Sequence, residues 1–157
     1  MADTEDWQIQ ELVPHAGRMC LLDRLVSVEG ETLIAEVELR EDHLFLDSLG
    51  PGTGVGAWVG IEYMAQAVAA WAGAQARAAG EAPKIGFLLG SRRYRCELPR
   101  FERGQVLQVV ARREYQADNG LGQFACEIRL ADRVVASAQV TVFGPDDPEK
   151  FIRGETT

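Results

Sequence analysis

The sequence has few of the residues that build covalent or metal cross-links. Its three cysteines, Cys20, Cys96 and Cys126, are far apart and form no CxxC pair. This spacing argues against a disulfide framework and against a zinc site. Isolated cysteines of this kind are typical of buried, reduced thiols in a cytoplasmic protein. The sequence therefore predicts neither disulfides nor a metal centre.

The motifs that define several large enzyme classes are also missing. No GxSxG, Walker loop, HExxH or dinucleotide GxGxxG occurs in the context that each requires. The glycine-rich stretch 52–56 (GTGVG) is not followed by Gly-Lys-Ser or Gly-Lys-Thr. This absence leaves nucleotide binding only weakly supported.

Basic residues are outnumbered, with 16 Lys and Arg against 24 Asp and Glu, for a net charge of −8. A chain with this balance is not expected to seek nucleic acid or an anionic membrane surface. The polar, acidic N-terminus (MADTEDWQIQ) does not have the form of a secretory signal. Residues 55–74 are long enough to span a bilayer, but they are mostly Ala and Gly and contain Glu62 and Gln66 near their middle. We therefore expect no membrane insertion and a cytoplasmic location.

Hydrophobic periodicity and turn residues predict a single domain, residues 1–157, with flexible tails at 1–6 and 146–157. The pattern predicts a short helix at 6–13, strands at 20–28 and 32–39, a long helix at 54–79, and strands at 85–96, 105–116, 121–130 and 134–143. This order is typical of an α+β protein with an antiparallel sheet packed on one helix. We predict a hot-dog fold, in which a curved sheet of about six strands wraps around one long central helix.

The predicted long helix contains one carboxylate, Glu62, between Gly54 and Gln75. A carboxylate on so apolar a helix needs an explanation, because burying one alone is costly. Gln66 lies one turn later and shares its face. A structural explanation is that Glu62 pairs with a nearby arginine. A functional explanation is that Glu62 acts near the positive end of the helix dipole, where the backbone N–H groups of Gly54 and Gly56 serve an acyl carbonyl.

Two further groups of residues have both a structural and a functional interpretation. The only histidines are His15, in a loop between predicted elements, and His43, on the charged stretch Glu41-Asp42-His43. An isolated histidine is either structural or a proton carrier. Arg92, Arg93 and Arg95 lie close together in this acidic chain, and on a regular strand Arg93 and Arg95 share one face. They form either a solvated edge or a dock for a phosphate or an acidic protein.

Three stretches resemble one known family: 12–25 (LVPHAGRMCLLDRL), 58–69 (WVGIEYMAQAVA) and 84–94 (KIGFLLGSRRY). They are similar to hot-dog-fold 3-hydroxyacyl-ACP dehydratases, and most similar to the branch associated with aryl-polyene and related pigment synthesis. The likeness extends over most of residues 10–145, and the stretch IEYMAQA is its most specific part.

In that family a helix Glu works with a His, and Glu62 matches the Glu. The His normally lies in a Gly-His-Phe-Pro motif about fourteen residues earlier, a position that here reaches Ser48, and the motif is absent. The resemblance also includes a Pro-His pair near the acyl site, which His15 matches. We therefore expect His15 to partner Glu62, with His43 as the second choice.

The resemblance further implies a homodimer whose substrate arrives on the phosphopantetheine arm of acyl carrier protein, with no other cofactor. The substrate-binding residues would be Gly54, Gly56, Gln66, Phe87 and Leu89. The carrier protein, being acidic, would dock on Arg92, Arg93 and Arg95.

The leading prediction is dehydration of a 3-hydroxyacyl thioester to the trans-2-enoyl thioester, with His15 as general base and Glu62 as general acid. Two alternatives stay open. One is a thioesterase of the same fold, in which Glu62 activates water. The other is a non-catalytic subunit that binds carrier protein and pairs with an active dehydratase-like or ketosynthase-like protein, a reading that the missing Gly-His-Phe-Pro motif favours.

Overall fold

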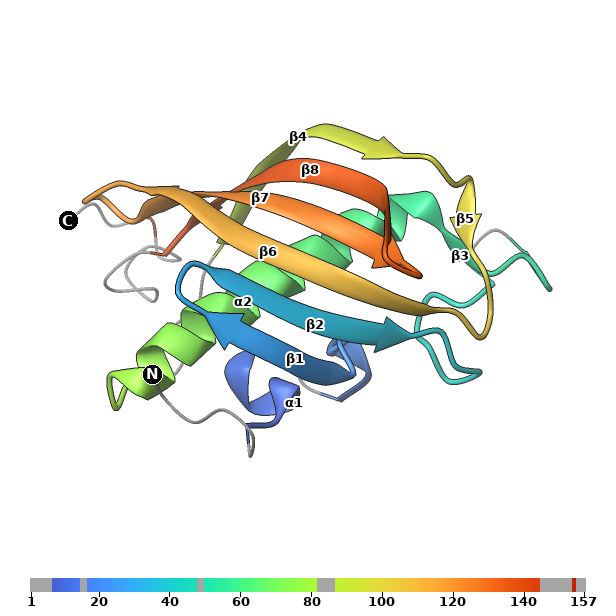
Figure 1. Ribbon diagram of the computed structural model, residues 1–157, viewed down its shortest axis with the longest axis horizontal. Coiled ribbons are helices and arrows are strands. Elements are labelled where there is room, and N and C mark those ends of the chain that lie inside the picture. Colours follow the sequence, from blue (N-terminus) through green and yellow to red (C-terminus); the bar gives the residue numbers. More distant parts are fainter. Residues whose placement is uncertain (1–6, 15–16, 48–49, 82–86, 145–153, 155–157) are drawn as a thin grey trace.

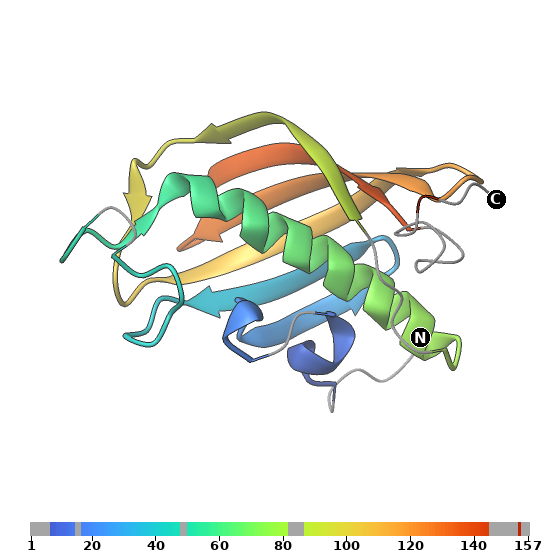
Figure 2. The ribbon, with the colours of Figure 1, turned by 180° about the vertical axis from the view of Figure 1, so that it is seen from behind.

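A computed structural model describes residues 7–14, 17–47, 50–81, 87–144 and 154. Six antiparallel strands form one curved sheet in the order β1-β2-β6-β7-β8-β4. The 19-residue helix α2 lies along its concave face (Figures 1 and 2). The α+β architecture predicted from the sequence is confirmed. The element bounds are α2 Gly60–Ala78, β1 Arg24–Glu29, β2 Thr32–Glu38, β4 Phe87–Cys96, β6 Val106–Gln116, β7 Leu121–Leu130 and β8 Arg133–Phe143.

The long helix begins six residues later than the pattern predicted, at Gly60 rather than Gly54. Gly54 has φ +81°, which is incompatible with a right-handed helix. The next residues form β3 (Val55–Gly56) and a 3₁₀ turn, η2 (Ala57–Val59). β3 pairs with β5 (Arg100–Phe101), a short strand that lies between the strands predicted at 85–96 and 105–116. A two-stranded sheet at the start of α2 therefore replaces the first predicted turns of helix.

The N-terminal segment also differs from the prediction in its bounds. The short helix α1 spans Ile9–Leu12 and ends before Pro14, which disfavours helical backbone in the residue that precedes it. A 3₁₀ turn, η1 (Gly17–Met19), follows. Strand β1 begins at Arg24 rather than at Cys20. The reason is that the backbone N–H of Leu21 donates to the side chain of Gln66 on α2 and not to a neighbouring strand.

Small residues let α2 approach its neighbours closely. The alanines of its inner face, such as Ala67 and Ala70, are fully buried in the core. A Cβ on Gly73 would overlap the backbone carbonyl of Leu12 on α1, and one on Gly60 would overlap the hydroxyl of Tyr94 on β4. None of the helices in the described residues is long and apolar enough to cross a membrane.

Helix α2 ends at Ala78, one residue before the predicted end at 79, and Gly80 follows its C-cap, Ala79. The N–H of Glu81 donates to the carbonyl of Ala76, and the N–H of Gly80 donates to the carbonyl of Arg77. This pair of bonds is the Schellman motif, and it requires the left-handed conformation that Gly80 adopts at φ +76°. The tails predicted at 1–6 and 146–157, except Gly154, lie outside the described residues.

All three cysteines are free thiols. Cys126 is buried on β7, and burial raises the pKa of its thiol to about 12. Cys20 and Cys96 are partly buried, and burial also raises the pKa of the Cys20 thiol. Thiols that stay protonated are poor nucleophiles. Cys20 and Cys126 therefore act as packing groups.

Candidate active site

Glu62 occupies the first turn of α2, and its side chain is half-buried. Its Oε1 accepts a hydrogen bond from Nε2 of Gln66, one helical turn later, at 3.1 Å. Because the helix begins at Gly60, Glu62 lies closer to the positive end of the helix dipole than the sequence predicted. The two residues singled out on the predicted helix are therefore in direct contact.

Gln66 is the one polar or charged side chain in the described residues that is buried, with 1% of its surface exposed. Its Oε1 accepts from the backbone N–H of Leu21 at 2.8 Å. Its Nε2 donates both to the carbonyl of Met19 at 2.8 Å and to Glu62. Both amide hydrogens are thus used, and the side chain fixes the loop before β1 to the helix beside Glu62. This geometry makes Gln66 a positioning residue that holds the carboxylate.

In the sequence His15 lies between the described residues Pro14 and Gly17. Pro14 lines the same groove as Glu62, and Met19 is hydrogen-bonded to the neighbour of Glu62. The chain on both sides of His15 is thus held near the carboxylate. His15 itself lies outside the described residues, so its pairing with Glu62 stays a prediction.

A groove with a volume of about 470 Å³ begins beside Glu62 and extends along α2. Its apolar walls come from the helix and from the strands that face it. The helix contributes alanines and Val68, β4 contributes Leu88, β7 contributes Phe124 and β8 contributes Val142. The groove is also lined by groups that can donate or accept hydrogen bonds, on Gln75, Glu81, Arg113 and Gln116. A half-buried carboxylate at one end of a mainly apolar groove is suited to an acyl substrate.

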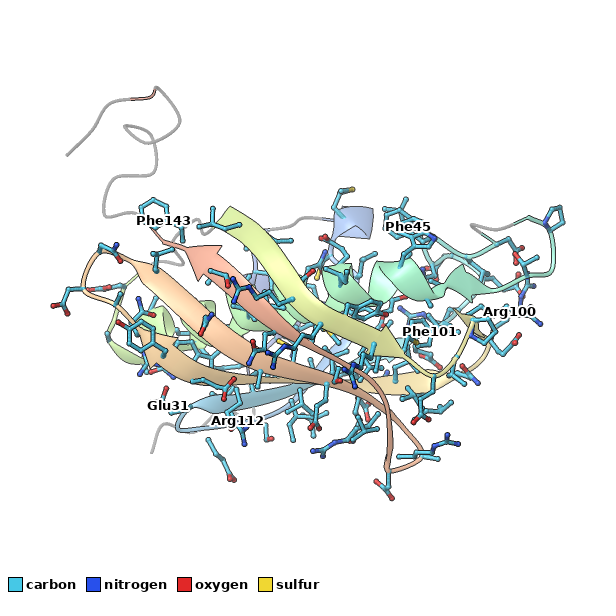
Figure 3. The ribbon with its side chains drawn as sticks, turned by 90° about the horizontal axis from the view of Figure 1, so that it is seen from above. Glu31, Phe45, Arg100, Phe101, Arg112 and Phe143 are labelled. Atoms are coloured by element: carbon cyan, nitrogen blue, oxygen red, sulfur yellow. The ribbon has the colours of Figure 1, made fainter. Side chains whose placement is uncertain are left out.

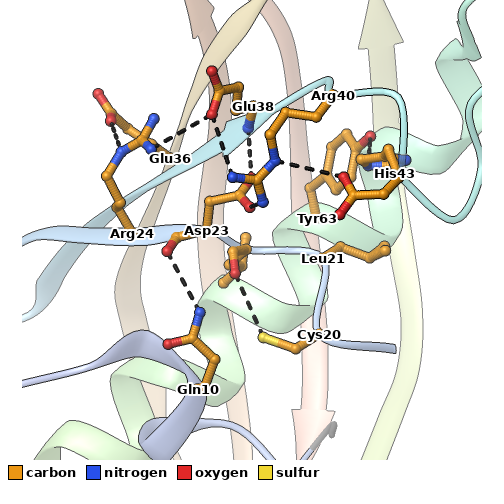
Figure 4. Close-up of polar contacts among 12 residues, drawn as sticks. Gln10, Cys20, Leu21, Asp23, Arg24, Glu36, Glu38, Arg40, His43 and Tyr63 are labelled. Atoms are coloured by element: carbon orange, nitrogen blue, oxygen red, sulfur yellow. Dashed lines mark hydrogen bonds and ion pairs between the residues drawn. The ribbon is translucent and has the colours of Figure 1, made fainter. Parts of the chain in front are cut away.

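His43, the second candidate partner of Glu62, is hydrogen-bonded to other residues. Its Nδ1 accepts a hydrogen bond from the backbone N–H of Phe45 at 3.1 Å, and its Nε2 lies 2.9 Å from the hydroxyl of Tyr63 (Figure 4). An accepting Nδ1 places the proton of the neutral ring on Nε2, which then donates to Tyr63. Burial lowers the pKa of His43 and favours this neutral ring. Tyr63 is fully buried, and burial raises the pKa of its phenol, which therefore stays protonated.

His43 borders a different hollow, with a volume of about 350 Å³ and with Asp23 and Arg40 on its walls. Asp23 accepts from Arg40 and from the backbone N–H of Glu38 at 2.6 Å (Figure 4). This network fixes the loop after β2 to the edge of the sheet. The observed partners of His43 therefore give it a structural role.

Gly54 and Gly56 are both buried beside the start of α2. The N–H of Gly54 donates to Oδ1 of Asp47 at 3.2 Å, and a Cβ on Gly54 would overlap the carbonyl of Phe101. A Cβ on Gly56 would overlap the indole of Trp58. Close packing of β3 explains both glycines without a ligand. A role for their N–H groups toward a substrate carbonyl stays a prediction.

The start of β4 was predicted to line the acyl site through Phe87 and Leu89. The side chain of Phe87 is outside the described part of the chain. Leu88, rather than Leu89, borders the groove. A β-bulge between Leu88 and Gly90 breaks the alternation of the strand, and both leucines are partly exposed, at 45% and 55%.

Arg92, Arg93 and Arg95 all lie on β4 with exposed side chains. A second bulge lies between Arg92 and Arg95, and Arg93 adopts φ +56°. The simple alternation expected for these arginines is therefore wrong. None of the three makes an ion pair within the described residues, whereas eight other arginines pair with carboxylates: Arg24, Arg40, Arg77, Arg100, Arg103, Arg113, Arg129 and Arg133.

Sequence reasoning did not single out the aromatic and basic residues that line the groove. Trp71, Phe124 and Arg113 come from α2, β7 and β6 and meet only in the folded chain. Their individual positions read as ordinary core or surface residues. The sequence did contain one indication. Side chains alternate along a strand, so Arg113 is expected on the same face of β6 as the buried Val109 and Ala111.

The chain is similar to known dehydratases. The model of the ApeP-like family, described as ApeP dehydratase, matches residues 7–153. A 3-hydroxyacyl-[acyl-carrier-protein] dehydratase FabZ from Lactobacillus helveticus is 26% identical over 147 residues, which cover 92% of this chain and 95% of that protein.

Solved structures confirm the hot-dog fold. The dehydratase heterocomplex ApeI:P from Xenorhabdus doucetiae contains a chain with 28% identity and a TM-score of 0.84, covering 93% of this chain and 95% of that one. The phenylacetic acid degradation protein PaaI from Thermus thermophilus shares the fold at 17% identity and a TM-score of 0.56, covering 77% of this chain and 91% of that one. The match to the family model over nearly the whole chain identifies this protein as a member of the ApeP-like dehydratase family.

Proposed function

We propose that this protein dehydrates a 3-hydroxyacyl thioester, carried on acyl carrier protein, to the trans-2-enoyl thioester. The observation that carries the proposal is the position of Glu62 in a mainly apolar groove, where it is hydrogen-bonded to Gln66, which also donates to the carbonyl of Met19. Membership of the ApeP-like dehydratase family and the likeness to FabZ support the same reaction.

In the proposed reaction His15 removes the proton from C2 of the acyl chain. The electrons of that C–H bond form the C2–C3 double bond as the C3–O bond breaks. Glu62 donates its proton to the departing hydroxyl, which leaves as water. The excess proton on the imidazole returns to the carboxylate through solvent before the next turnover. Gln66 contributes by holding the carboxylate in place.

The reaction is tested by incubating the purified protein with a 3-hydroxyacyl-ACP and following the absorbance of the conjugated enoyl thioester. Free thiol is measured in the same samples, because a thioesterase would release thiol without enoyl product. Enoyl formation that is lost in Glu62→Gln supports the proposal. Thiol release alone would support the thioesterase. No product from the wild type with any chain length, alone or in the complex considered below, would refute both enzymatic functions.

The three arginines of β4 are the proposed docking site for the carrier protein. Exposed cations that make no ion pair within the described part of the chain are suited to an acidic protein or to the phosphate of its prosthetic arm. Replacing Arg92, Arg93 and Arg95 with Gln should weaken binding of the carrier and flatten its salt dependence. Replacing the paired Arg24, Arg129 and Arg133 with Gln removes the same charge from the protein and serves as the control. Equal loss in both variants would show a general charge effect.

A second candidate function is that of a subunit in a heterocomplex with another dehydratase. The observation that favours it is the solved structure at a TM-score of 0.84, which is itself a dehydratase heterocomplex. Strand β4 is at the edge of the sheet, so one side of it is open to pairing with another chain. The same edge would serve the homodimer expected from the sequence.

Light scattering of the protein alone and after co-expression with a second hot-dog dehydratase distinguishes these assemblies. A stable dimer of the single chain supports the homodimer. A complex that forms only with the second subunit supports the heterocomplex. Glu62→Gln in that complex then decides whether this chain is catalytic, because a non-catalytic subunit would leave the activity unchanged.

A further inference from the structure

The first turn of α2 carries Glu62 but has no capping side chain. Val59, the residue before the helix, makes no side-chain hydrogen bond to the helix backbone, and Gly56, before the turn η2, has no side chain that could. Helix starts are usually stabilised by a Ser, Thr, Asp or Asn side chain that accepts from a backbone N–H group. Because helix ends fray, the position of Glu62 depends on contacts from elsewhere in the fold.

Tyr94 on β4 supplies such a contact. Its hydroxyl donates to the carbonyl of Ala57 in η2. A Cβ on Gly60, the first residue of α2, would overlap the same hydroxyl and would lie 3.3 Å from Cζ of the ring. Burial raises the pKa of the Tyr94 phenol, so the hydroxyl keeps the proton that it donates. The phenol therefore lies directly against the backbone from which α2 begins, two residues before Glu62.

The backbone of β4 is irregular where it carries Tyr94. A bulge lies between Arg92 and Arg95, and β-bulges re-aim side chains, often beside active sites. The flanking arginines are exposed, whereas Tyr94 is half-buried against the helix. Figure 3 shows the strand, in yellow, running toward Arg100 and Phe101, which pair with β3 just before η2. Tyr94 therefore joins the edge strand to the end of the molecule at which α2 starts.

Glu62 is thus fixed on two sides by different kinds of contact. Gln66 donates to its carboxylate at 3.1 Å from one turn later. Tyr94 fixes the backbone that precedes the carboxylate. The carbonyl of Ala57 also accepts from the N–H of Gly60, so removal of the Tyr94 hydroxyl would not leave this carbonyl unpaired. The hydroxyl can therefore be deleted without the desolvation penalty of an unsatisfied buried group.

We propose that Tyr94 is a positioning residue for the dehydration, whose hydroxyl holds the start of α2 so that Glu62 meets the departing hydroxyl of the substrate. The inference rests on the proposed function, which makes Glu62 the general acid. A displacement of about 1 Å in a catalytic group can reduce the rate by about 10²-fold. Tyr94 needs no contact with substrate for this role, because it acts through the backbone at the start of the helix. Its effect should therefore be confined to the chemical step.

The test compares kcat and KM of Tyr94→Phe and wild type with two substrates, a 3-hydroxyacyl-ACP and the corresponding 3-hydroxyacyl-pantetheine. The full chain is used, in the homodimer or the heterocomplex in which the wild type is active. We expect kcat to fall by about 10–10²-fold with both substrates. KM should not change, because neither the groove nor the arginines of β4 are altered. The melting temperature should fall by no more than about 4 °C, as expected for the loss of one hydrogen bond in a chain of this length.

Tyr115→Phe is the matched control. It loses the same hydroxyl from a side chain that is 60% exposed on β6. Arg112, three residues earlier on this strand, lies toward the end of the molecule opposite Phe101 (Figure 3). Both kinetic constants of this variant should match those of the wild type with either substrate.

The outcomes separate this inference from the proposed function. A wild-type kcat in Tyr94→Phe, or an equal fall in Tyr115→Phe, would overturn the inference while leaving the proposed function intact. A rise in KM for the acyl-ACP alone would assign Tyr94 to carrier docking and would overturn it as well. A fall in kcat with a larger loss of melting temperature would show a merely structural role and would also overturn it. No product from the wild type with either substrate would refute the reaction, and the inference with it.

Discussion

Gln66 donates a hydrogen bond to Glu62 across one turn of α2, at 3.1 Å, and it does so from a fully buried position. The same amide group binds the backbone of the loop before β1 at both Met19 and Leu21. The carboxylate is thereby coupled to a loop that lies far from it in the sequence. This arrangement separates the reacting group, which needs access to substrate, from the group that fixes its position.

Replacing Glu62 with Gln should abolish most of the activity while leaving the fold intact. The amide has the shape of the carboxylic acid and can still accept from Gln66, but it cannot donate a proton to a leaving hydroxyl. We expect the rate of dehydration to fall by about 10²–10⁴-fold. Enoyl absorbance measures the rate, and thermal unfolding measures the fold. Glu114→Gln, on the exposed surface of β6, is the control and should keep wild-type activity.

Replacing Gln66 with Leu should destabilise the protein strongly. The change leaves the buried N–H of Leu21 and the partly buried carbonyl of Met19 without their observed partner, and an unsatisfied buried group costs about 1–3 kcal/mol. Urea denaturation should show a loss of about 2–5 kcal/mol in the free energy of unfolding. Gln75→Leu, exposed on the same helix, should change it by no more than about 0.5 kcal/mol. Equal stability of the two variants would contradict the role of Gln66 in fixing the loop before β1 to α2.

The order of the elements could be predicted from the sequence because each main strand carries its own periodicity. Leu121–Leu130 was predicted with its observed bounds, since its alternation is regular and the turn Asp118-Asn119-Gly120 precedes it. Gly80 likewise indicated the end of α2, because its left-handed conformation is a local requirement. Such signals depend only on residues that are neighbours in the chain.

The sequence failed where a distant partner decides the conformation. Residues 20–23 read as strand, but Gln66 draws the N–H of Leu21 away from the sheet. Val55 and Gly56 read as helix, but they pair with Arg100 and Phe101. The site residues also divide into those with a local signal in the sequence and those that only the fold brings together. Glu62 was conspicuous because no other carboxylate lies near it on the helix, whereas the groove residues are ordinary until the fold brings them together.

The stability of the fold should depend on His43 below neutral pH. Burial lowers the pKa of His43 from its ordinary value of 6.5, so the unfolded chain binds a proton at a higher pH than the folded chain does. Between the two pKa values the unfolded state holds more protons, and the free energy of unfolding decreases as the pH falls. Above about pH 6.5 this contribution to the pH dependence vanishes.

Urea denaturation of wild type and His43→Gln, between pH 8 and pH 5, measures this dependence. The difference in the free energy of unfolding between the two proteins should be constant above about pH 7 and should shrink as the pH falls below 6.5, as the wild type loses the advantage of its neutral ring. Carboxylates titrate in both proteins and largely cancel in the difference. A difference that grows toward acid pH would show that the folded protein favours the charged imidazole, contrary to the geometry with Phe45 and Tyr63.

The variant Gly73→Ala tests whether the stability of the protein depends more on the close contact between α2 and α1 or on the helix propensity of residue 73. In a helix interior Ala is favoured over Gly by about 1 kcal/mol, so Gly73→Ala would stabilise an isolated helix. Here the added Cβ would overlap the backbone carbonyl of Leu12, which is fully buried and cannot move without displacing α1. Overpacking of this kind typically costs about 1–3 kcal/mol, which exceeds the gain in propensity.

We therefore expect Gly73→Ala to lower the free energy of unfolding, as measured by urea denaturation, despite its higher helix propensity. The control is Gly90→Ala on β4, where a new Cβ would meet nothing within 4 Å. That variant should be as stable as the wild type or slightly more stable, because alanine restricts the unfolded chain. A Gly73→Ala protein of wild-type stability would mean that α1 can shift away from α2. His15 follows α1 closely in the sequence, so the same variant should then show an altered rate of dehydration.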